Sequence, residues 1–139
     1  MTQGEQVSRS RRSVLISIVD DDELVREALG RLMKASGYLA QMYDSGSSLL
    51  NSEHLARTDC LIADMLMPGM SGLELHRRFT AAGMTIPTIL ITGHPDEATR
   101  SRAMEAGVLG YFTKPISSTE LLLCVSSAVD EREVNWRPK

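Results

Sequence analysis

The stretch Val14-Leu15-Ile16-Ser17-Ile18-Val19-Asp20-Asp21-Asp22 decides the fold of this chain. Its first six residues are mostly apolar and rich in β-branched side chains, which is typical of a strand buried on both faces. Three aspartates follow directly, and Leu24 to Met33 then carry apolar side chains at helical spacing. A buried strand that leads straight into an amphipathic helix is the first half of a βαβ unit, so the stretch predicts a parallel sheet.

The alternation of strand and helix continues along the chain. We expect strands over 14–19, 39–43, 60–64, 88–92 and 109–113, and helices over about 24–36, 45–55, 72–82, 95–106 and 118–134. Pro95 is placed as the first residue of its helix, and Ser118 or Thr119 as the cap of the last one. The predicted fold is α/β: a doubly wound five-stranded parallel sheet of order 2-1-3-4-5, with helices on both faces.

Composition and length favour one globular domain. The chain has 139 residues, of which 42% are hydrophobic and 24% charged, so it is long enough for one domain with a core and too short for two ordinary domains. We expect a flexible arm over 1–13, the domain over 14–134 and a tail over 135–139. Cys60 and Cys124 lie among apolar residues and are interpreted as buried thiols, which suits a reducing compartment. The net charge of −3 gives no electrostatic footprint for nucleic acid.

The pair Arg11-Arg12 superficially resembles a twin-arginine export signal. Such a signal needs a longer apolar stretch than the one that stops at Asp20. No other segment approaches the roughly twenty apolar residues of a membrane span. The sequence therefore predicts a cytoplasmic protein without a membrane partner.

Polar residues stand where three of the predicted strands end and just beyond a fourth. Parallel strands end at one edge of the sheet, so five side chains are expected to share one pocket: Asp20, Asp21, Asp64, Thr92 and Lys114. Asp22 is interpreted as a helix cap only. Three clustered carboxylates repel one another unless a cation neutralises them, and hard oxygen ligands suit Mg²⁺. The pocket could bind this ion and accept a phosphoryl group.

Four segments, in this order, resemble the signature segments of the receiver domain of two-component response regulators. They are Val19-Asp20-Asp21-Asp22, the loop from Asp64 to Gly72 (Asp-Met-Leu-Met-Pro-Gly-Met-Ser-Gly), Ile91-Thr92-Gly93-His94, and Lys114-Pro115. The resemblance covers about residues 14 to 134. The Thr-Gly-His step and the Met-Pro loop are similar to the FixJ-like branch of the family. A flavodoxin/CheY-like fold is what this resemblance implies.

The resemblance also implies roles for the pocket residues. Asp64 would be the phosphoacceptor, taking a phosphoryl group from the histidine of a sensor kinase or phosphotransfer protein. Mg²⁺ would be bound by Asp21 and Asp64 directly, by Asp20 mainly through water, and by the backbone carbonyl of Leu66. Thr92 and Lys114 would contact the phosphoryl oxygens, and the Lys114-Pro115 bond would be cis.

A conformational switch is implied by the same resemblance. Tyr111 matches the aromatic position that turns inward when Thr92 moves toward the phosphoryl group, although an ordinary strand-edge tyrosine is the alternative. The surface of the last two helices and the strand between them would change and contact a downstream protein. Leu66 and His94 occupy the positions that tune phosphate lifetime, and we hypothesise that Leu66 excludes water.

The residues of the pocket favour a signalling domain over other classes of protein. The chain is expected to be a phosphoacceptor signalling domain that assists its own phosphorylation and dephosphorylation, and not an enzyme in its own right. Whether it acts alone, forms a phosphorylation-dependent homodimer, or is the receiver of a FixJ-like DNA-binding regulator stays open. A haloacid dehalogenase-type phosphatase needs a second aspartate where this chain has Leu66. A flavodoxin-like electron carrier is disfavoured because Asp20-Asp21-Asp22 would repel a flavin phosphate, and the intact pocket disfavours a receiver that only binds partners.

Overall fold

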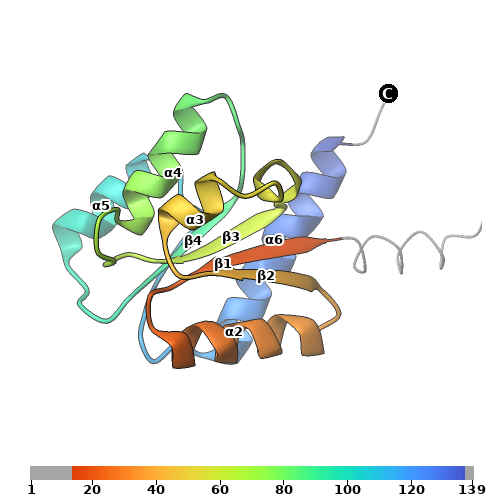
Figure 1. Ribbon diagram of the computed structural model, residues 1–139, viewed down its shortest axis with the longest axis horizontal. Coiled ribbons are helices and arrows are strands. Elements are labelled where there is room, and N and C mark those ends of the chain that lie inside the picture. Colours follow the sequence, from red (N-terminus) through yellow and green to blue (C-terminus); the bar gives the residue numbers. More distant parts are fainter. Residues whose placement is uncertain (1–13, 137–139) are drawn as a thin grey trace, which may run out of the picture.

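The computed structural model describes residues 14–136, with side chains for residues 14–130, and it is a single parallel sheet covered by helices on both faces (Figure 1). The strands are β1 (Leu15–Val19), β2 (Leu39–Tyr43), β3 (Cys60–Asp64), β4 (Thr88–Thr92) and β5 (Gly110–Thr113). The helices are α2 (Glu23–Ala35), α3 (Gly46–Leu50), α4 (Gly72–Ala81), α5 (Glu97–Glu105) and α6 (Ser118–Trp136), with a 3-10 turn η1 (Leu55–Arg57). The strand order is β2-β1-β3-β4-β5, all parallel, which confirms the predicted fold.

Each face of the sheet carries its own hydrophobic core. Ile16 and Ile18 point toward α2 and α6 and pack in one cluster with Leu29, Met33 and Val125. Their neighbours along the strands point the other way, and the second cluster joins the sheet to α3, α4 and α5. Strands β1, β3 and β4 are buried along their whole length, as expected for a parallel sheet between two helical layers.

The start of α5 and the capping residue of α6 differ from the predictions. Pro95 is not the first residue of α5, because Asp96 caps this helix by accepting a hydrogen bond from the Thr99 N–H at 3.1 Å. The last helix begins at Ser118, and the hydroxyl of Ser117 accepts from the Glu120 N–H at 3.2 Å. In both cases a side chain next to the predicted residue caps the helix: Asp96 follows Pro95, and Ser117 precedes Ser118.

The predicted helix over 45–55 is shorter than expected. The helix starts near the predicted position, with Ser45 as its cap, but it ends at Leu50. Beyond it, the Ser52 hydroxyl accepts from the His54 N–H at 2.9 Å and hydrogen-bonds the Tyr43 hydroxyl at 2.9 Å. These side-chain bonds compete with helical backbone bonds and break the segment into α3 and η1.

Candidate functional site

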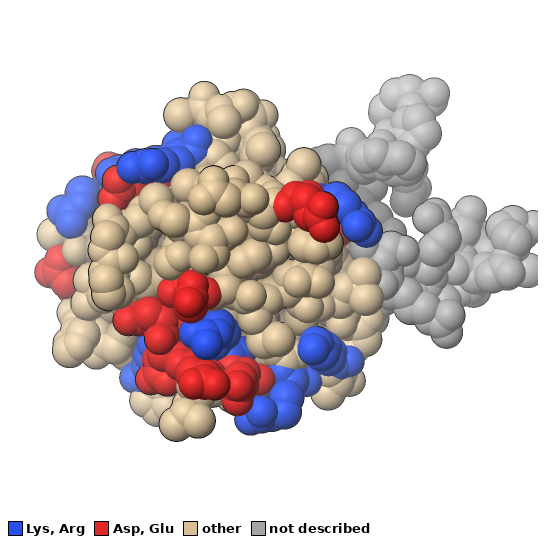
Figure 2. Space-filling model, viewed as in Figure 1, with Lys and Arg blue, Asp and Glu red and all other residues tan. Residues whose placement is uncertain are grey.

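The acidic residues meet at the carboxyl edge of the sheet. Asp20 follows β1 and Asp64 ends β3, and the two strands are neighbours in which Val19 pairs with Ala63. Asp20 and Asp64 are buried, whereas Asp21 is exposed. One carboxylate oxygen from each of the three lies within 4.8 Å of the others, which is close enough for a shared metal ion. Acidic side chains also gather over the amino end of α2, as Figure 2 shows.

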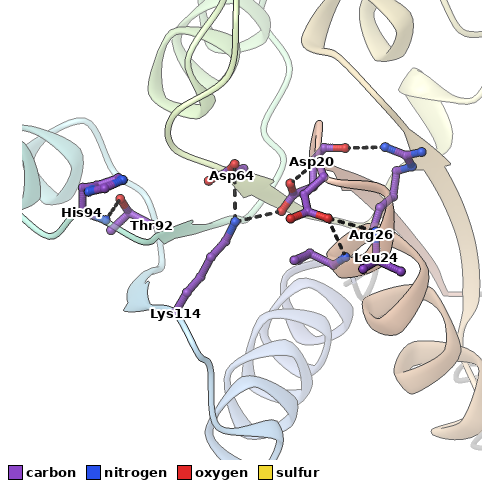
Figure 3. Close-up of polar contacts among 9 residues, drawn as sticks. Asp20, Leu24, Arg26, Asp64, Thr92, His94 and Lys114 are labelled. Carbon is purple, nitrogen blue, oxygen red and sulfur yellow. Dashed lines mark hydrogen bonds and ion pairs between the residues drawn. The ribbon is translucent and has the colours of Figure 1, made fainter.

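Asp20 is fixed in place from two sides. The Asp22 N–H donates to Asp20 Oδ1 at 2.9 Å, and the guanidinium of Arg26 donates to the Asp20 carbonyl at 2.7 Å (Figure 3). Asp22 caps α2 as predicted, accepting from the Leu24 N–H at 3.0 Å. Arg26 was not among the predicted site residues. Arg26 lies about one turn into α2, on the face of the helix that is directed back toward the end of β1. This position in the sequence could have identified it.

Lys114 reaches into the cluster from the segment after β5. Its Nζ lies 3.3 Å from Asp20 Oδ2 and 3.5 Å from Asp64 Oδ2 (Figure 3). The Lys114-Pro115 peptide bond is cis. Burial by itself would lower the pKa of Lys114, but the carboxylates of Asp20 and Asp64 outweigh it and raise this pKa above its usual value. The lysine is therefore charged and acts as the counterion of both aspartates.

The electrostatics of the cluster suit a cation. Burial, followed by the charge of Asp20, raises the pKa of Asp64, while Lys114 acts in the opposite direction. Asp20 Oδ2 is buried, and within the described residues its one polar partner is the Lys114 ammonium, 3.3 Å away. An oxygen of this kind is costly unless a positive charge approaches it. The donor set of three carboxylates thus fits a hard divalent ion.

Thr92 lies at the end of β4, on the far side of β3 from Asp20. It is fully buried, and its hydroxyl accepts from the His94 N–H at 3.0 Å (Figure 3). The Lys114 N–H donates to the Thr92 carbonyl at 2.8 Å, but within residues 14–130 no side-chain hydrogen bond joins Thr92 to Asp64 or Lys114. The structure therefore brings four of the five predicted pocket residues into one cluster and leaves Thr92 beside it.

Two further predicted residues border the site. Tyr111 of β5 pairs with Leu90 and packs partly buried against the second core cluster. Its hydroxyl is buried without a hydrogen bond to any described residue. Leu66, in the loop after β3, is 52% exposed beside the acidic cluster.

The fold and the acidic cluster define a doubly wound α/β domain with an acidic pocket, able to hold a metal ion, at the carboxyl ends of its central strands. The sequence profile of the response regulator receiver domain matches residues 16–126. The chain belongs to this family, and is a receiver domain of two-component systems. Receiver domains are signalling domains. The resemblance to this family that the sequence indicated is confirmed.

The relatives agree with the FixJ-like resemblance. The response regulator protein TodT of Pseudomonas putida is 39% identical over 120 residues, covering 86% of this chain and 53% of TodT. The transcriptional regulatory protein FixJ of Rhizobium meliloti is 34% identical over 113 residues, covering 81% of this chain and 55% of FixJ. The chain thus spans about half the length of these relatives.

Solved structures give the same result. The structure described as FixJ-N aligns with a TM-score of 0.75 and 32% identity, covering 84% of this chain and 94% of the other. The response regulator StyR aligns with a TM-score of 0.79 and 34% identity, covering 88% and 64%. Within the described part of the chain, no helix has the length and apolarity required to cross a bilayer.

Proposed function

We propose that Asp64 accepts a phosphoryl group from the phosphohistidine of a sensor kinase or phosphotransfer protein. The observation that carries this proposal is the cluster of Asp20, Asp21 and Asp64 around the ammonium of Lys114, at the end of the two central strands. A carboxylate oxygen of Asp64 forms the new P–O bond while the P–N bond to the histidine breaks.

The residues of the cluster fit one Mg²⁺ ion. Asp21 and Asp64 would hold it directly, Asp20 mainly through water, and the Leu66 carbonyl would complete the protein ligands. When bound, the ion supplies positive charge to the phosphoryl oxygens in the transition state. Arg26 holds the Asp20 carbonyl at 2.7 Å, so that Asp20 keeps its carboxylate turned toward the cluster.

Lys114 and Thr92 would then report the phosphoryl group. Lys114 already lies 3.5 Å from Asp64 and needs only to exchange a carboxylate contact for a phosphoryl one. The Thr92 hydroxyl would leave the His94 N–H and turn to the phosphoryl oxygens. Charge-assisted hydrogen bonds contribute roughly 1.5 to 3 kcal/mol each, and two of them approach the roughly 5.5 kcal/mol of a full population reversal.

The movement of Thr92 would be transmitted through Tyr111. The tyrosine hydroxyl is buried without a hydrogen bond to any described residue, so its present position carries a cost that a second arrangement could relieve. We propose that the surface of α5, β5 and α6 changes with it and contacts a downstream protein. A phosphorylation-dependent homodimer through the same surface is the alternative use.

The domain would also assist its own phosphorylation and dephosphorylation. Leu66 and His94 flank the path of the attacking water, and neither is an acid or an amide. With its side chain half exposed over the cluster, Leu66 would shield the acyl phosphate from water.

We place the receiver domain at residues 14–134 and propose that it acts in the cytoplasm, where a sensor kinase would present its histidine. The predicted arm, residues 1–13, lies outside the part of the chain that the structure describes. Residues 137–139 of the predicted tail also lie outside it. A second candidate is the receiver of a DNA-binding transcriptional regulator. Two observations favour it: the relative FixJ is described as a transcriptional regulatory protein, and the chain covers about half of FixJ.

The proposal is tested with a small phosphodonor such as acetyl phosphate, with and without Mg²⁺, followed by intact-mass measurement. Wild type should gain one phosphoryl group only when Mg²⁺ is present, and Asp64→Asn should gain none. Asp130→Asn, which changes an exposed aspartate of α6, is the matched control and should label like wild type. Labelling that survives in Asp64→Asn would remove Asp64 from its role.

A further inference from the structure

Strand β2 is an edge of the sheet whose outer side pairs with no strand in the described part of the chain. Its inner side faces β1: the Leu39 N–H donates to the Val14 carbonyl, and the Tyr43 carbonyl accepts from the Asp20 N–H. Backbone groups of a strand alternate in direction from one residue to the next. Ala40 and Met42 therefore present their N–H and C=O groups to the open edge.

The same strand is unusually apolar for an edge. Leu39 is 47% exposed and Met42 is 37% exposed, whereas the residues of β1, β3 and β4 are buried. Proteins protect an open edge from pairing with other chains by charges or proline, and β2 carries neither in the sequence Leu-Ala-Gln-Met-Tyr. An edge left in this condition is suited to the addition of a strand.

A basic hollow adjoins the beginning of this edge. It measures about 250 Å³ and is lined by Lys34 from the end of α2, by Tyr38 and Gln41 beside or within β2, and by His54 and Arg57 at η1. Among the described residues, neither Lys34 nor Arg57 has a carboxylate within 4 Å, and His54 has only Glu53, at 3.9 Å. In Figure 2, basic surface lies on both sides of the beginning of β2, and the upper basic patch adjoins an acidic one.

We propose that the edge of β2 binds an extended, acidic segment of a partner protein as a sixth strand. The Ala40 and Met42 backbone groups would supply the strand pairing, and Lys34 and Arg57 would hold a carboxylate of the segment in the hollow. Charge complementarity selects this occupant. A second copy paired in parallel would set basic hollow against basic hollow, and residues 1–13 carry Arg9, Arg11 and Arg12. A copy paired antiparallel would set the hollow beside the carboxyl end of the other β2, and the test below examines it as self-association.

This site is separate from the proposed phosphorylation site. The hollow lies at the amino end of β2, while the aspartate cluster lies at the carboxyl ends of β1 and β3. The β2 edge is also the opposite edge of the sheet from β5, to which the phosphorylation-dependent surface belongs. The proposal therefore holds or fails independently of Asp64.

The test uses a fluorescein-labelled peptide of about eight residues that alternates Glu with Val, and a matched peptide that alternates Lys with Val. Fluorescence anisotropy should show binding of the acidic peptide only, and amide NMR shifts should centre on residues 39–43. The double variant Lys34→Glu/Arg57→Glu should weaken binding about tenfold or more. The control Arg31→Glu/Arg100→Glu makes the same change of net charge at exposed positions outside the hollow and should bind like wild type.

Two acidic peptides, N-methylated on one or the other alternate set of residues, test the strand pairing itself. Only the set that faces β2 should matter, so one peptide should lose binding and the other keep it. Equal effects of the two sets would overturn strand addition. Citrate binding as tightly as the peptide, with the same NMR shifts, would reduce the site to a small-anion hollow and overturn the proposal. Self-association of the free protein through residues 39–43 would overturn it in favour of a second copy.

Discussion

Replacing Lys114 by methionine should make the stability of this domain depend on Mg²⁺. The ammonium lies 3.3 Å from Asp20 Oδ2 and 3.5 Å from Asp64 Oδ2. With the screening of bulk water, each pair contributes roughly 1.2 kcal/mol and the two together about 2.4 kcal/mol. These values are lower bounds, because the lysine side chain is only 25% exposed and its partners Asp20 and Asp64 are buried. Its own desolvation offsets part of this sum, which leaves an expected loss of about 1 to 2 kcal/mol.

The loss should appear only when the cluster has no other cation. In EDTA, Lys114→Met leaves Asp20 and Asp64 facing each other with no counterion, so the free energy of unfolding falls by the amount above. In saturating Mg²⁺ the ion neutralises the same carboxylates, and the variant should recover. A recovery of about 1 kcal/mol corresponds to roughly fivefold tighter Mg²⁺ binding by the variant, because the two effects are linked.

Urea unfolding in EDTA and in MgCl₂, together with calorimetric titration of Mg²⁺, measures both quantities. Lys34→Met is the matched control, since Lys34 has no carboxylate within 4 Å among the described residues, and it should change little in either solution. An equal loss of stability with and without Mg²⁺ would refute the reasoning, because the lysine and the ion would then not share the carboxylates.

Four other substitutions test single features of the structure. Because the pKa of Asp64 is raised in the folded protein, its charged form costs stability as the pH rises from about 3.8 through the folded value; Asp64→Asn should therefore be more stable than wild type at neutral pH in EDTA, and a gap that persists unchanged at pH 3 would contradict this. Burial lowers the pKa of His76, so stability should fall as the pH drops below about 6.5 toward the folded value, and His76→Gln should flatten that slope in pH-dependent urea melts. Tyr111→Phe removes a buried hydroxyl that hydrogen-bonds no residue in the described part of the chain, and should stabilise the domain by up to about 1 kcal/mol; a loss of stability would show that the hydroxyl is satisfied. Leu66→Asn should speed the loss of phosphate, followed by intact mass over time, and an unchanged rate would count against water exclusion by Leu66.

Much of the fold was predictable because its signals are local. Strands β1, β3 and β4 are buried on both faces and are therefore continuous apolar runs. Each could be predicted as a strand from its own residues alone. The short connections and the alternation with helices then fixed the strand order, and with it the meeting of Asp20 and Asp64.

The features that were missed depend on contacts that a sequence does not display. The break after Leu50 is set by Ser52, whose hydroxyl contacts both the His54 N–H and the Tyr43 hydroxyl. Arg26 becomes part of the site only because α2 returns it to the Asp20 carbonyl. The Thr92 hydroxyl accepts a hydrogen bond from the His94 N–H, a contact that no pattern of residue types predicts.

The beginning of α4 lies against the end of β3. A Cβ built on Gly72 would come within 2.6 Å of the Asp64 carbonyl oxygen and 2.8 Å of Leu90 Cδ2. Because the first of these contacts is with backbone, no rotamer change can relieve it, and any larger residue must push the helix from the strand that holds Asp64. We therefore expect evolution to accept only glycine at position 72. Even one methyl group there would displace Asp64, the proposed nucleophile.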